Sequence, residues 1–264
     1  MGPWSRGSLS RVVKLESLKD EPYCWVICYP RYSPDELERR LQEMRTLGVK
    51  AIEFSGVRFV LNIPVLGKGC VGIVVAAHTE KGKVALKIRR TDANRENMKR
   101  EAEMLRLANS VGVGPRLFGI TENILMMEFV EGTLLPEWVE TLSGEDRVVK
   151  DRIRKVLKEV LEQSRRLDKI GLDHGELSRA SRHIMVGPNE EVYILDFETA
   201  STKRRASNVT SVSQFLFVKG DVAEAVTKRI GRVRREELIS ALRAYKRSKS
   251  NEAFEELLKA CKLI

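Results

Sequence analysis

The segment Gly67-Lys-Gly-Cys-Val-Gly72 constrains the fold of this chain more than any other. Alone, such a G-x-G-x-x-G pattern fits two unrelated folds, because dinucleotide-binding proteins also use it. In those proteins the glycines lie between a strand and a helix. Here residues 73–77 are Ile-Val-Val-Ala-Ala, which indicates a strand after the loop. Glycines between two antiparallel strands let backbone N–H groups approach phosphates, so the sequence predicts a phosphate-binding hairpin.

One lysine, Lys87, lies in the apolar strand that ends Val84-Ala-Leu-Lys87, thirteen residues after Val74. A buried ammonium is costly unless a carboxylate pairs with it, and the helix expected next offers Glu101. Glu103 is the weaker partner because it lies about 200° further around that helix. The alternative is a lysine whose ammonium reaches the surface, which the loop upstream disfavours.

Two acidic segments follow the long helix expected near residues 148–170. They are Asp173-His-Gly-Glu-Leu177 and Ile194-Leu-Asp-Phe-Glu198. One carboxylate, Glu176, can orient or deprotonate a hydroxyl, while the other, Asp196, binds Mg²⁺ that bridges phosphates. Each acid alone reads as a solvated loop acid or a helix cap. Their order after Lys87 favours the functional interpretation.

The apolar strand 124–129 runs into Glu128, Phe129 and Val130, ahead of Gly132. A strand that crosses over in this way offers backbone groups to an adenine edge, with Met127 as the last strand residue behind the base. The segment by itself is unspecific, since many buried strands end similarly.

Periodicity predicts an α+β, two-lobed fold. Residues 1–56 read as a small strand–helix–strand extension, with strands near 23–29 and 51–54 and a helix that Ser33 and Pro34 begin. Residues 57–132 read as an antiparallel lobe with one helix near 94–110 and five strands, at 57–66, 73–78, 84–89, 117–120 and 124–129. Residues 133–264 read as a reduced, mostly helical lobe with a basic tail, interrupted by a strand at 192–195 and ending in helices near 222–230 and 235–262.

The charge of the chain indicates possible partners, and its cysteines indicate the compartment. The net charge is +10, and residues 203–264 carry 15 Lys and Arg against 7 Asp and Glu. This asymmetry favours an acidic partner such as RNA or a ribonucleoprotein, or equally a solvated helical surface. Four cysteines without C-x-x-C spacing indicate structural thiols in a reducing compartment, the cytoplasm. No segment has the length or apolarity expected for a membrane span.

The succession G-x-G-x-x-G-x-V, V-A-L-K, M-E-F-V-E-G, H-G-E-L and I-L-D-F resembles the eukaryotic-type protein kinases. The H-G pair and the small C-terminal lobe are similar to RIO-type kinases, and above all to an archaeal family of serine/threonine protein kinases. The resemblance covers about residues 57–200. It implies ATP binding by Gly67, Lys68, Gly69, Gly72, Val74, Ala85, Lys87, Met127, Glu128 and Val130. It implies catalytic roles for Lys87, Glu101, Glu176 and Asp196, with Asp196 as the magnesium ligand.

The chain departs from this family pattern at three places. The catalytic acid is Glu176 rather than aspartate, which moves the carboxylate by one methylene. Where the family has asparagine, the chain offers Ser181 or, with a two-residue insertion, His183. We favour His183, which can position the loop or bind the ion, although imidazole is a poor Mg²⁺ ligand. Glu198 replaces the glycine of a D-F-G triplet.

The resemblance implies a Mg²⁺-dependent kinase that transfers phosphate from ATP to serine or threonine of a protein, itself included. Two alternatives stay open. One is a pseudokinase or slow ATPase that acts as a nucleotide-dependent binding module on an RNA–protein assembly. The other keeps the site but transfers phosphate to a small molecule.

Overall fold

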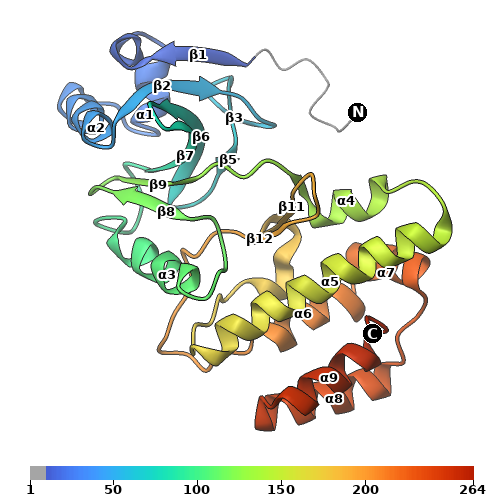
Figure 1. Cartoon of the computed structure of the whole chain (residues 1–264). Helices are drawn as coiled ribbons and strands as arrows, with labels where there is room; N and C mark the ends of the chain where they lie inside the picture. The colour runs from blue at the N-terminus through green and yellow to red at the C-terminus, as the bar shows by residue number, and fades with distance from the viewer. Residues whose placement is uncertain (1–9) are drawn as a thin grey trace. The chain divides into compact units, whose positions relative to one another are not determined.

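The computed structural model describes residues 10–264, which form two compact units. The first contains the described residues up to Arg106 together with Pro115–Phe129. The second contains Leu107–Gly114 and Val130–Ile264. The expected boundary near residue 56 lies inside the first unit, and residues 1–9 of the expected extension lie outside the described part. The antiparallel sheet and the helices confirm the α+β class (Figure 1).

The first unit is built on a seven-stranded sheet in the order β1-β2-β6-β7-β9-β8, with β5 paired to β6. Every pairing in it is antiparallel. Its strands are β1 (Arg11–Lys14), β2 (Val49–Phe54), β5 (Gly67–Lys68), β6 (Gly72–Thr79), β7 (Gly82–Arg89), β8 (Leu117–Ile120) and β9 (Ile124–Glu128). The strands expected at 73–78, 84–89, 117–120 and 124–129 are therefore confirmed, and β1 and β2 widen the sheet beyond the five strands expected.

The pairing register shows which side chains lie on each of the two faces of this sheet. Val74 pairs with Lys87 and Ala85 pairs with Met127, so these four side chains share one face, which we call the site face. Ile73, Val75, Leu86 and Ile88 point the other way and are at most 1% exposed. That opposite face, the core face, packs with apolar side chains of residues 13–54 in one cluster.

Two helices supply much of that cluster, α1 (Tyr23–Ile27) and α2 (Pro34–Thr46) (Figure 1). The expected start of α2 is confirmed, because the Ser33 hydroxyl accepts a hydrogen bond from the Glu36 N–H at 3.2 Å. Leu37, Leu41 and Met44 are buried on one stripe of this helix. Residues 11–54 therefore form the cover of the core face.

The prediction of a strand at 23–29 is wrong, because Tyr23–Ile27 forms the helix α1. Tyr23, Val26 and Ile27 are buried while Trp25 is 39% exposed, and this spacing fits one face of the helix α1 rather than the two-residue alternation of a strand. The first strand of the extension is β1 instead. The strand expected at 57–66 is a small hairpin of β3 (Arg58–Val60) and β4 (Ile63–Val65), because Leu61 and Asn62 turn the chain with φ of 48° and 64°.

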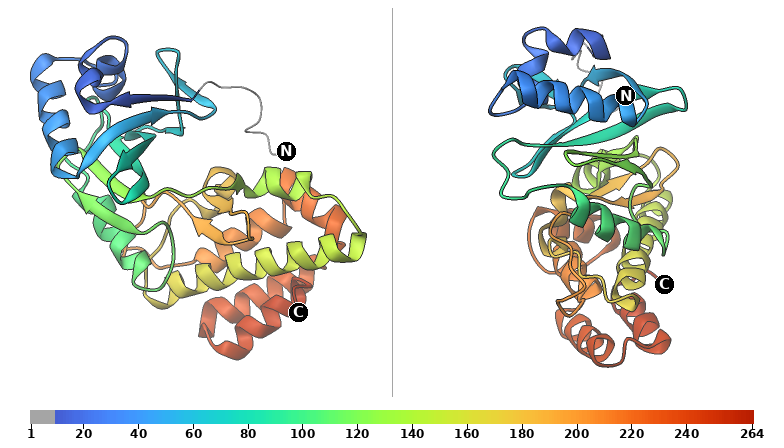
Figure 2. Two further views of the ribbon diagram at one scale, coloured as in Figure 1. Left: turned by 45° about the horizontal axis from the view of Figure 1, so that its top comes forward. Right: turned by 90° about the vertical axis from the view of Figure 1, so that its left-hand side faces the viewer.

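The second unit is mostly helical, as expected. Its helices are α4 (Leu135–Thr141), α5 (Asp146–Lys169), α6 (Asn208–Phe217), α7 (Asp221–Ile230), α8 (Arg235–Ser248) and α9 (Asn251–Ala260). The long helix α5 lies beside α6 and α7, and α8 and α9 form a hairpin (Figure 2). A three-stranded sheet joins β10 (Thr133–Leu134), β11 (Ile184–Val186) and β12 (Val192–Ile194). The 3-10 helix η3 (Leu177–Arg182) precedes β11.

The prediction of a single helix at 235–262 is wrong, because this segment forms two helices, α8 and α9, with a turn between them. Lys249 adopts a left-handed conformation with φ of 50°, which ends α8. The Ser250 hydroxyl then accepts a hydrogen bond from the Ala253 N–H at 3.2 Å and begins α9. Helices α4 and α6 were also not expected as separate elements.

Cysteine usage and helix length add two observations. Cys24, Cys28 and Cys261 are buried free thiols, as expected of structural cysteines, whereas the Cys70 thiol is exposed. Between residues 10 and 264, no helix has the length and apolarity that crossing a bilayer requires.

Candidate functional site

The glycine loop lies at the start of β6, where β5 folds back on it. Gly67 pairs with Val74 and Lys68 with Ile73, and the Gly69 N–H donates to the Gly72 carbonyl at 2.9 Å. A Cβ on Gly72 would lie 3.0 Å from the Ile88 carbonyl oxygen and 3.1 Å from Cγ of Lys87. A side chain at 72 would therefore press on the Ile88 carbonyl and on Lys87, and glycine lets the loop approach Lys87 closely.

The ion pair expected from the sequence forms. The Lys87 ammonium donates to Oε1 of Glu101, on α3 (Lys99–Asn109), at 2.7 Å. Both residues are 5% exposed, so water screens their attraction little. Glu103 is exposed, as the helical spacing predicts. The pair holds one cation on the site face, beside the glycine loop.

The other expected nucleotide-binding residues lie at several different places in the structure. Val74, Ala85 and Met127 share the site face with Lys87. Glu128 ends β9, and its N–H donates to the Arg116 carbonyl at 2.8 Å. The Lys68 ammonium lies over the Tyr29 ring, 4.6 Å from its centroid. Val130 begins the second unit.

The second unit brings Glu176, His183 and Asp196 together. Each offers one ligand atom, and these atoms lie within 4.8 Å of one another. Nε2 of His183 lies 3.0 Å from Oε2 of Glu176. Ser181, the other residue considered for this position, is exposed in η3. The apolar strand β11 follows directly after His183 and so fixes the register that places the imidazole beside Glu176.

Asp196 has an uncommon backbone conformation. Its φ is +67°, in the left-handed region that few residues other than glycine adopt. Phe197, next in the chain, is 2% exposed and anchors the turn. Strained backbone of this kind persists where the surroundings hold it, and it concentrates at functional sites.

His174 connects the two acidic segments. Its Nε2 lies 3.0 Å from the Leu195 carbonyl, which can only accept, so Nε2 carries the proton. The Thr199 hydroxyl donates to the His174 carbonyl at 2.9 Å, and the His174 N–H donates to Oδ1 of Asn208 at 2.9 Å. His174 therefore fixes the segment that carries Glu176 to the one that carries Asp196.

Burial lowers the pKa of His174 to about 4, against about 6.5 for an exposed histidine. We expect the unfolded chain to bind a proton here between pH 6.5 and 4 while the folded chain does not. Stability should then fall as the pH falls through this window, by up to about 3 kcal/mol. Urea unfolding at pH 7 and pH 5 measures the change, and His174→Leu should remove this part of the slope. An equal slope in the variant would contradict the prediction.

A buried polar network supports this region, and the sequence analysis missed it. The Asp168 carboxylate of α5 accepts hydrogen bonds from the Asn208 N–H at 2.7 Å and from the Tyr245 hydroxyl at 3.2 Å. Burial raises the pKa of Asp168, while hydrogen bonds from Asn208 and Val209 oppose that shift. The Asn208 amide donates to the Leu172 carbonyl at 2.7 Å, just before the first acidic segment. Asp168 and Asn208 lie 40 residues apart in the sequence and no local pattern marks either of them, so only the fold reveals this link.

The donor set of the second unit fits a magnesium ion in part. Glu176 and Asp196 supply the carboxylate oxygens that Mg²⁺ prefers. The His183 imidazole fits less well, because an Nε2–H that donates to Glu176 cannot bind a cation with the same nitrogen. This geometry favours His183 as the residue that orients Glu176.

Comparison with known proteins finds a family model and relatives that match parts of this chain. A family model of the RIO domain matches residues 75–212, a little over half of the chain. Uncharacterized protein MJ1211 of Methanocaldococcus jannaschii is 32% identical over 104 residues, which cover 39% of this chain and 83% of that protein. The KEOPS complex subunit Bud32 of Pyrococcus abyssi is 36% identical over 121 residues, which cover 45% of this chain and 49% of that protein. The chain thus matches only about half the length of Bud32.

Proposed function

This chain belongs to the RIO domain family, and from that premise we propose that it transfers the γ-phosphate of ATP to serine or threonine of a protein, itself included. The observation that carries the proposal is the buried pair of Lys87 and Glu101. A buried ammonium beside a glycine loop is suited to bind phosphate. The paired carboxylate offsets the free energy that is lost when the ammonium is removed from water.

The proposed reaction divides the work between the two units. Residues of the first unit bind ATP: the glycine loop covers the phosphates, Lys87 contacts them, and Val74, Ala85 and Met127 contact the base. Residues of the second unit act on the acceptor, where Glu176 takes the hydroxyl proton as the oxygen bonds to the γ-phosphorus and the bond to ADP breaks. His183 donates to Glu176 and orients it. Asp196 would hold Mg²⁺, which neutralises phosphate charge when bound.

Label transfer tests this proposal. The purified chain with Mg²⁺ and γ-labelled ATP should label itself or a generic acceptor such as casein, and Glu176→Gln should reduce the label strongly. The amide keeps the size of the side chain and removes its capacity to take a proton. ATP binding without any transfer would overturn the kinase proposal in favour of a nucleotide-dependent binding module. Phosphate transfer confined to small hydroxyl compounds would favour a small-molecule phosphotransferase instead.

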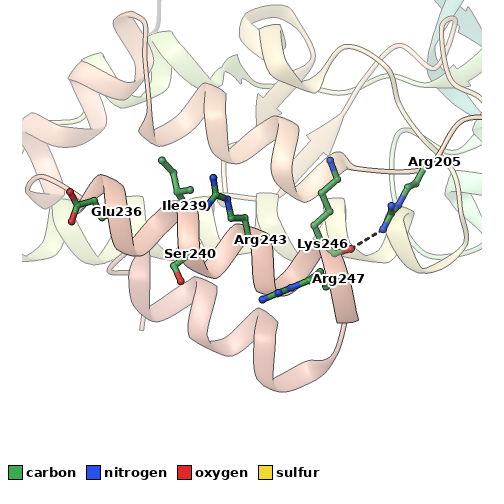
Figure 3. Close-up of a pocket in the computed structure, with 7 residues that line it drawn as sticks. All are labelled: Arg205, Glu236, Ile239, Ser240, Arg243, Lys246 and Arg247. Carbon is green, nitrogen blue, oxygen red and sulfur yellow. Dashed lines mark hydrogen bonds between the residues drawn. The ribbon is translucent and has the colours of Figure 1, made fainter.

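The partner is a separate question. One relative is a subunit of the KEOPS complex by name, and we propose that this chain also assembles with other macromolecules. A basic pocket on α8 of the second unit supports RNA as one of them (Figure 3). Its lining residues are Arg205, Glu236, Ile239, Ser240, Arg243, Lys246 and Arg247.

Charge and pairing favour a phosphate backbone in this pocket. Among the described residues, no carboxylate forms an ion pair with any of its four cations, whereas nearby Arg204 and Arg234 are paired with Asp173 and Glu237. Arg205 donates to the Lys246 carbonyl at 3.1 Å, which holds the end of its side chain at the helix. Three of the four cations are arginines, whose planar forks suit phosphate, and Ile239 is the one aliphatic residue that lines the pocket.

We expect Arg243→Glu with Arg247→Glu to weaken RNA binding about tenfold or more at 0.1 M salt and to flatten its salt dependence, because phosphate contacts release counterions. Lys219→Glu with Lys228→Glu is the matched control, since it changes the net charge equally away from this pocket. Fluorescence anisotropy with a labelled RNA hairpin measures both. The assignment would be overturned if both double variants lost RNA binding equally. It would also be overturned if an acidic peptide, rather than RNA, bound at this pocket.

The cytoplasmic location stays a prediction.

A further inference from the structure

Tyr29 lies outside the segment that the family model matches, and its ring contacts Lys68 of the glycine loop and Arg90, which directly follows β7. Its backbone is fixed to the end of β7, because the Thr91 N–H donates to the Tyr29 carbonyl at 3.0 Å. The Thr91 hydroxyl donates to the Cys28 carbonyl at 3.3 Å and accepts from the Arg31 N–H at 2.9 Å. Thr91 thus holds the residues before and after Tyr29 in place.

Two cations meet the Tyr29 ring. Nζ of Lys68, in the glycine loop, lies 4.6 Å from the ring centroid. The guanidinium carbon of Arg90, directly after β7, lies 5.0 Å from it. Both distances are in the range of cation–π attraction, which is stronger where the cation is partly removed from water. The Arg90 side chain is 19% exposed, so its contact is partly shielded.

Arg90 in turn holds the backbone of the loop. Its N–H donates to the Val71 carbonyl at 2.8 Å, and Nη1 donates to the Gly69 carbonyl at 3.1 Å. Asp92 accepts from Nε at 2.8 Å and from Nη2 at 2.7 Å, which fixes the plane of the guanidinium. A continuous set of contacts therefore leads from Tyr29 through Arg90 to the loop.

A loop of three glycines needs such support. Glycine has the largest backbone freedom of any residue, so ordering it around a ligand costs the most conformational entropy. Contacts that order the loop before the ligand arrives reduce this cost and strengthen binding. The loop's own side chains are few, and Tyr29 and Arg90 supply the contacts from outside it.

We propose that Tyr29 is a positioning residue, which holds the glycine loop in its nucleotide-binding conformation through Lys68 and Arg90. The inference rests on the proposed ATP site and assigns a task there to the N-terminal segment. Tyr29 does not itself touch the nucleotide in this role.

The competing explanation is that Tyr29 only packs, since its ring also lies against the core cluster. Three variants separate the two. Tyr29→Phe keeps the ring and its attraction for cations, whereas Tyr29→Leu keeps apolar bulk and loses the ring. Tyr32→Leu is the matched control, because Tyr32 packs against the same cluster and its ring meets Trp25 at 4.9 Å.

Two measurements are made on the full chain: the ATP dissociation constant by calorimetry, and amide hydrogen exchange without nucleotide. The Gly69 and Arg90 amides report on loop order, because each donates a hydrogen bond within the loop or to it. Tyr29→Leu should weaken ATP binding about five- to thirtyfold and speed exchange at both amides. Tyr29→Phe should match the unaltered chain, and Tyr32→Leu should change neither measurement.

Unchanged ATP affinity and unchanged exchange in Tyr29→Leu would overturn the inference. It would also fail if Tyr32→Leu produced the same changes, because both would then reflect lost packing. If the unaltered chain bound no ATP, the proposed function would fail, and exchange at Gly69 and Arg90 would still decide whether Tyr29 orders the loop.

Discussion

Replacing Lys87 with methionine is expected to abolish phosphate transfer and to lower the free energy of unfolding by about 3–5 kcal/mol. Transfer is lost because the uncharged side chain of methionine cannot replace the ammonium that Glu101 holds beside the glycine loop. Stability is lost because the Glu101 carboxylate, 5% exposed, stays buried without its ammonium. Label transfer from ATP measures the first effect, and urea unfolding measures the second.

The double variant Lys87→Met with Glu101→Leu separates the two effects. It removes both charges and fills the space with apolar atoms, so the free energy of unfolding should recover most of the loss while transfer stays absent. Arg116→Met with Glu128→Leu is a matched control, since that pair lies 3.7 Å apart with Arg116 largely exposed. The control should change stability by less than about 1 kcal/mol. A double variant at 87 and 101 as unstable as Lys87→Met would contradict this account.

Asp196→Asn is expected to reduce phosphate transfer about a hundredfold or more, with little loss of stability. Asparagine tolerates the left-handed conformation that residue 196 adopts, so the turn should persist while the negative charge is removed. The remaining activity should need higher Mg²⁺ concentrations, because an amide oxygen binds the ion more weakly than a carboxylate. Label transfer over a Mg²⁺ titration measures both changes.

Two variants control this prediction. Asp196→Ala also removes the charge but adds backbone strain, so it should be less stable than Asp196→Asn. Glu198→Gln removes a charge two residues away and should retain more activity. Equal losses in Asp196→Asn and Glu198→Gln would show that the overall negative charge, rather than the Asp196 carboxylate, supports transfer.

The central ion pair was predictable because it follows from one requirement. A lysine within apolar alternation must find a carboxylate, and the helix that follows β7 offers Glu101 on its inner side and Glu103 on its outer side. A different argument favoured His183 over Ser181, because the apolar strand that follows His183 sets the register there. The sheet order was less accessible, because nothing local indicates that β2 joins β6 rather than forming its own module.

The errors and omissions have separate physical causes. Residues 23–29 contain so many apolar side chains that strand and helix patterns both fit, and only the exposure of Trp25 distinguishes them. The break between α8 and α9 depends on a single left-handed residue, Lys249, which no propensity favours there. The contact of Tyr29 with Lys68 and Arg90 joins segments far apart in the sequence, so it follows from the fold alone.

The cover that residues 11–54 form over the core face has a practical consequence. The family match begins at residue 75, inside β6, so a polypeptide cut to the matched segment would start in mid-strand. It would expose the apolar side chains Val75, Leu86 and Ile88 to water and leave the edge of β6 open to pairing with other molecules. Such a fragment should aggregate. The limits of shared ancestry and the limits of independent folding therefore fall at different residues in this protein.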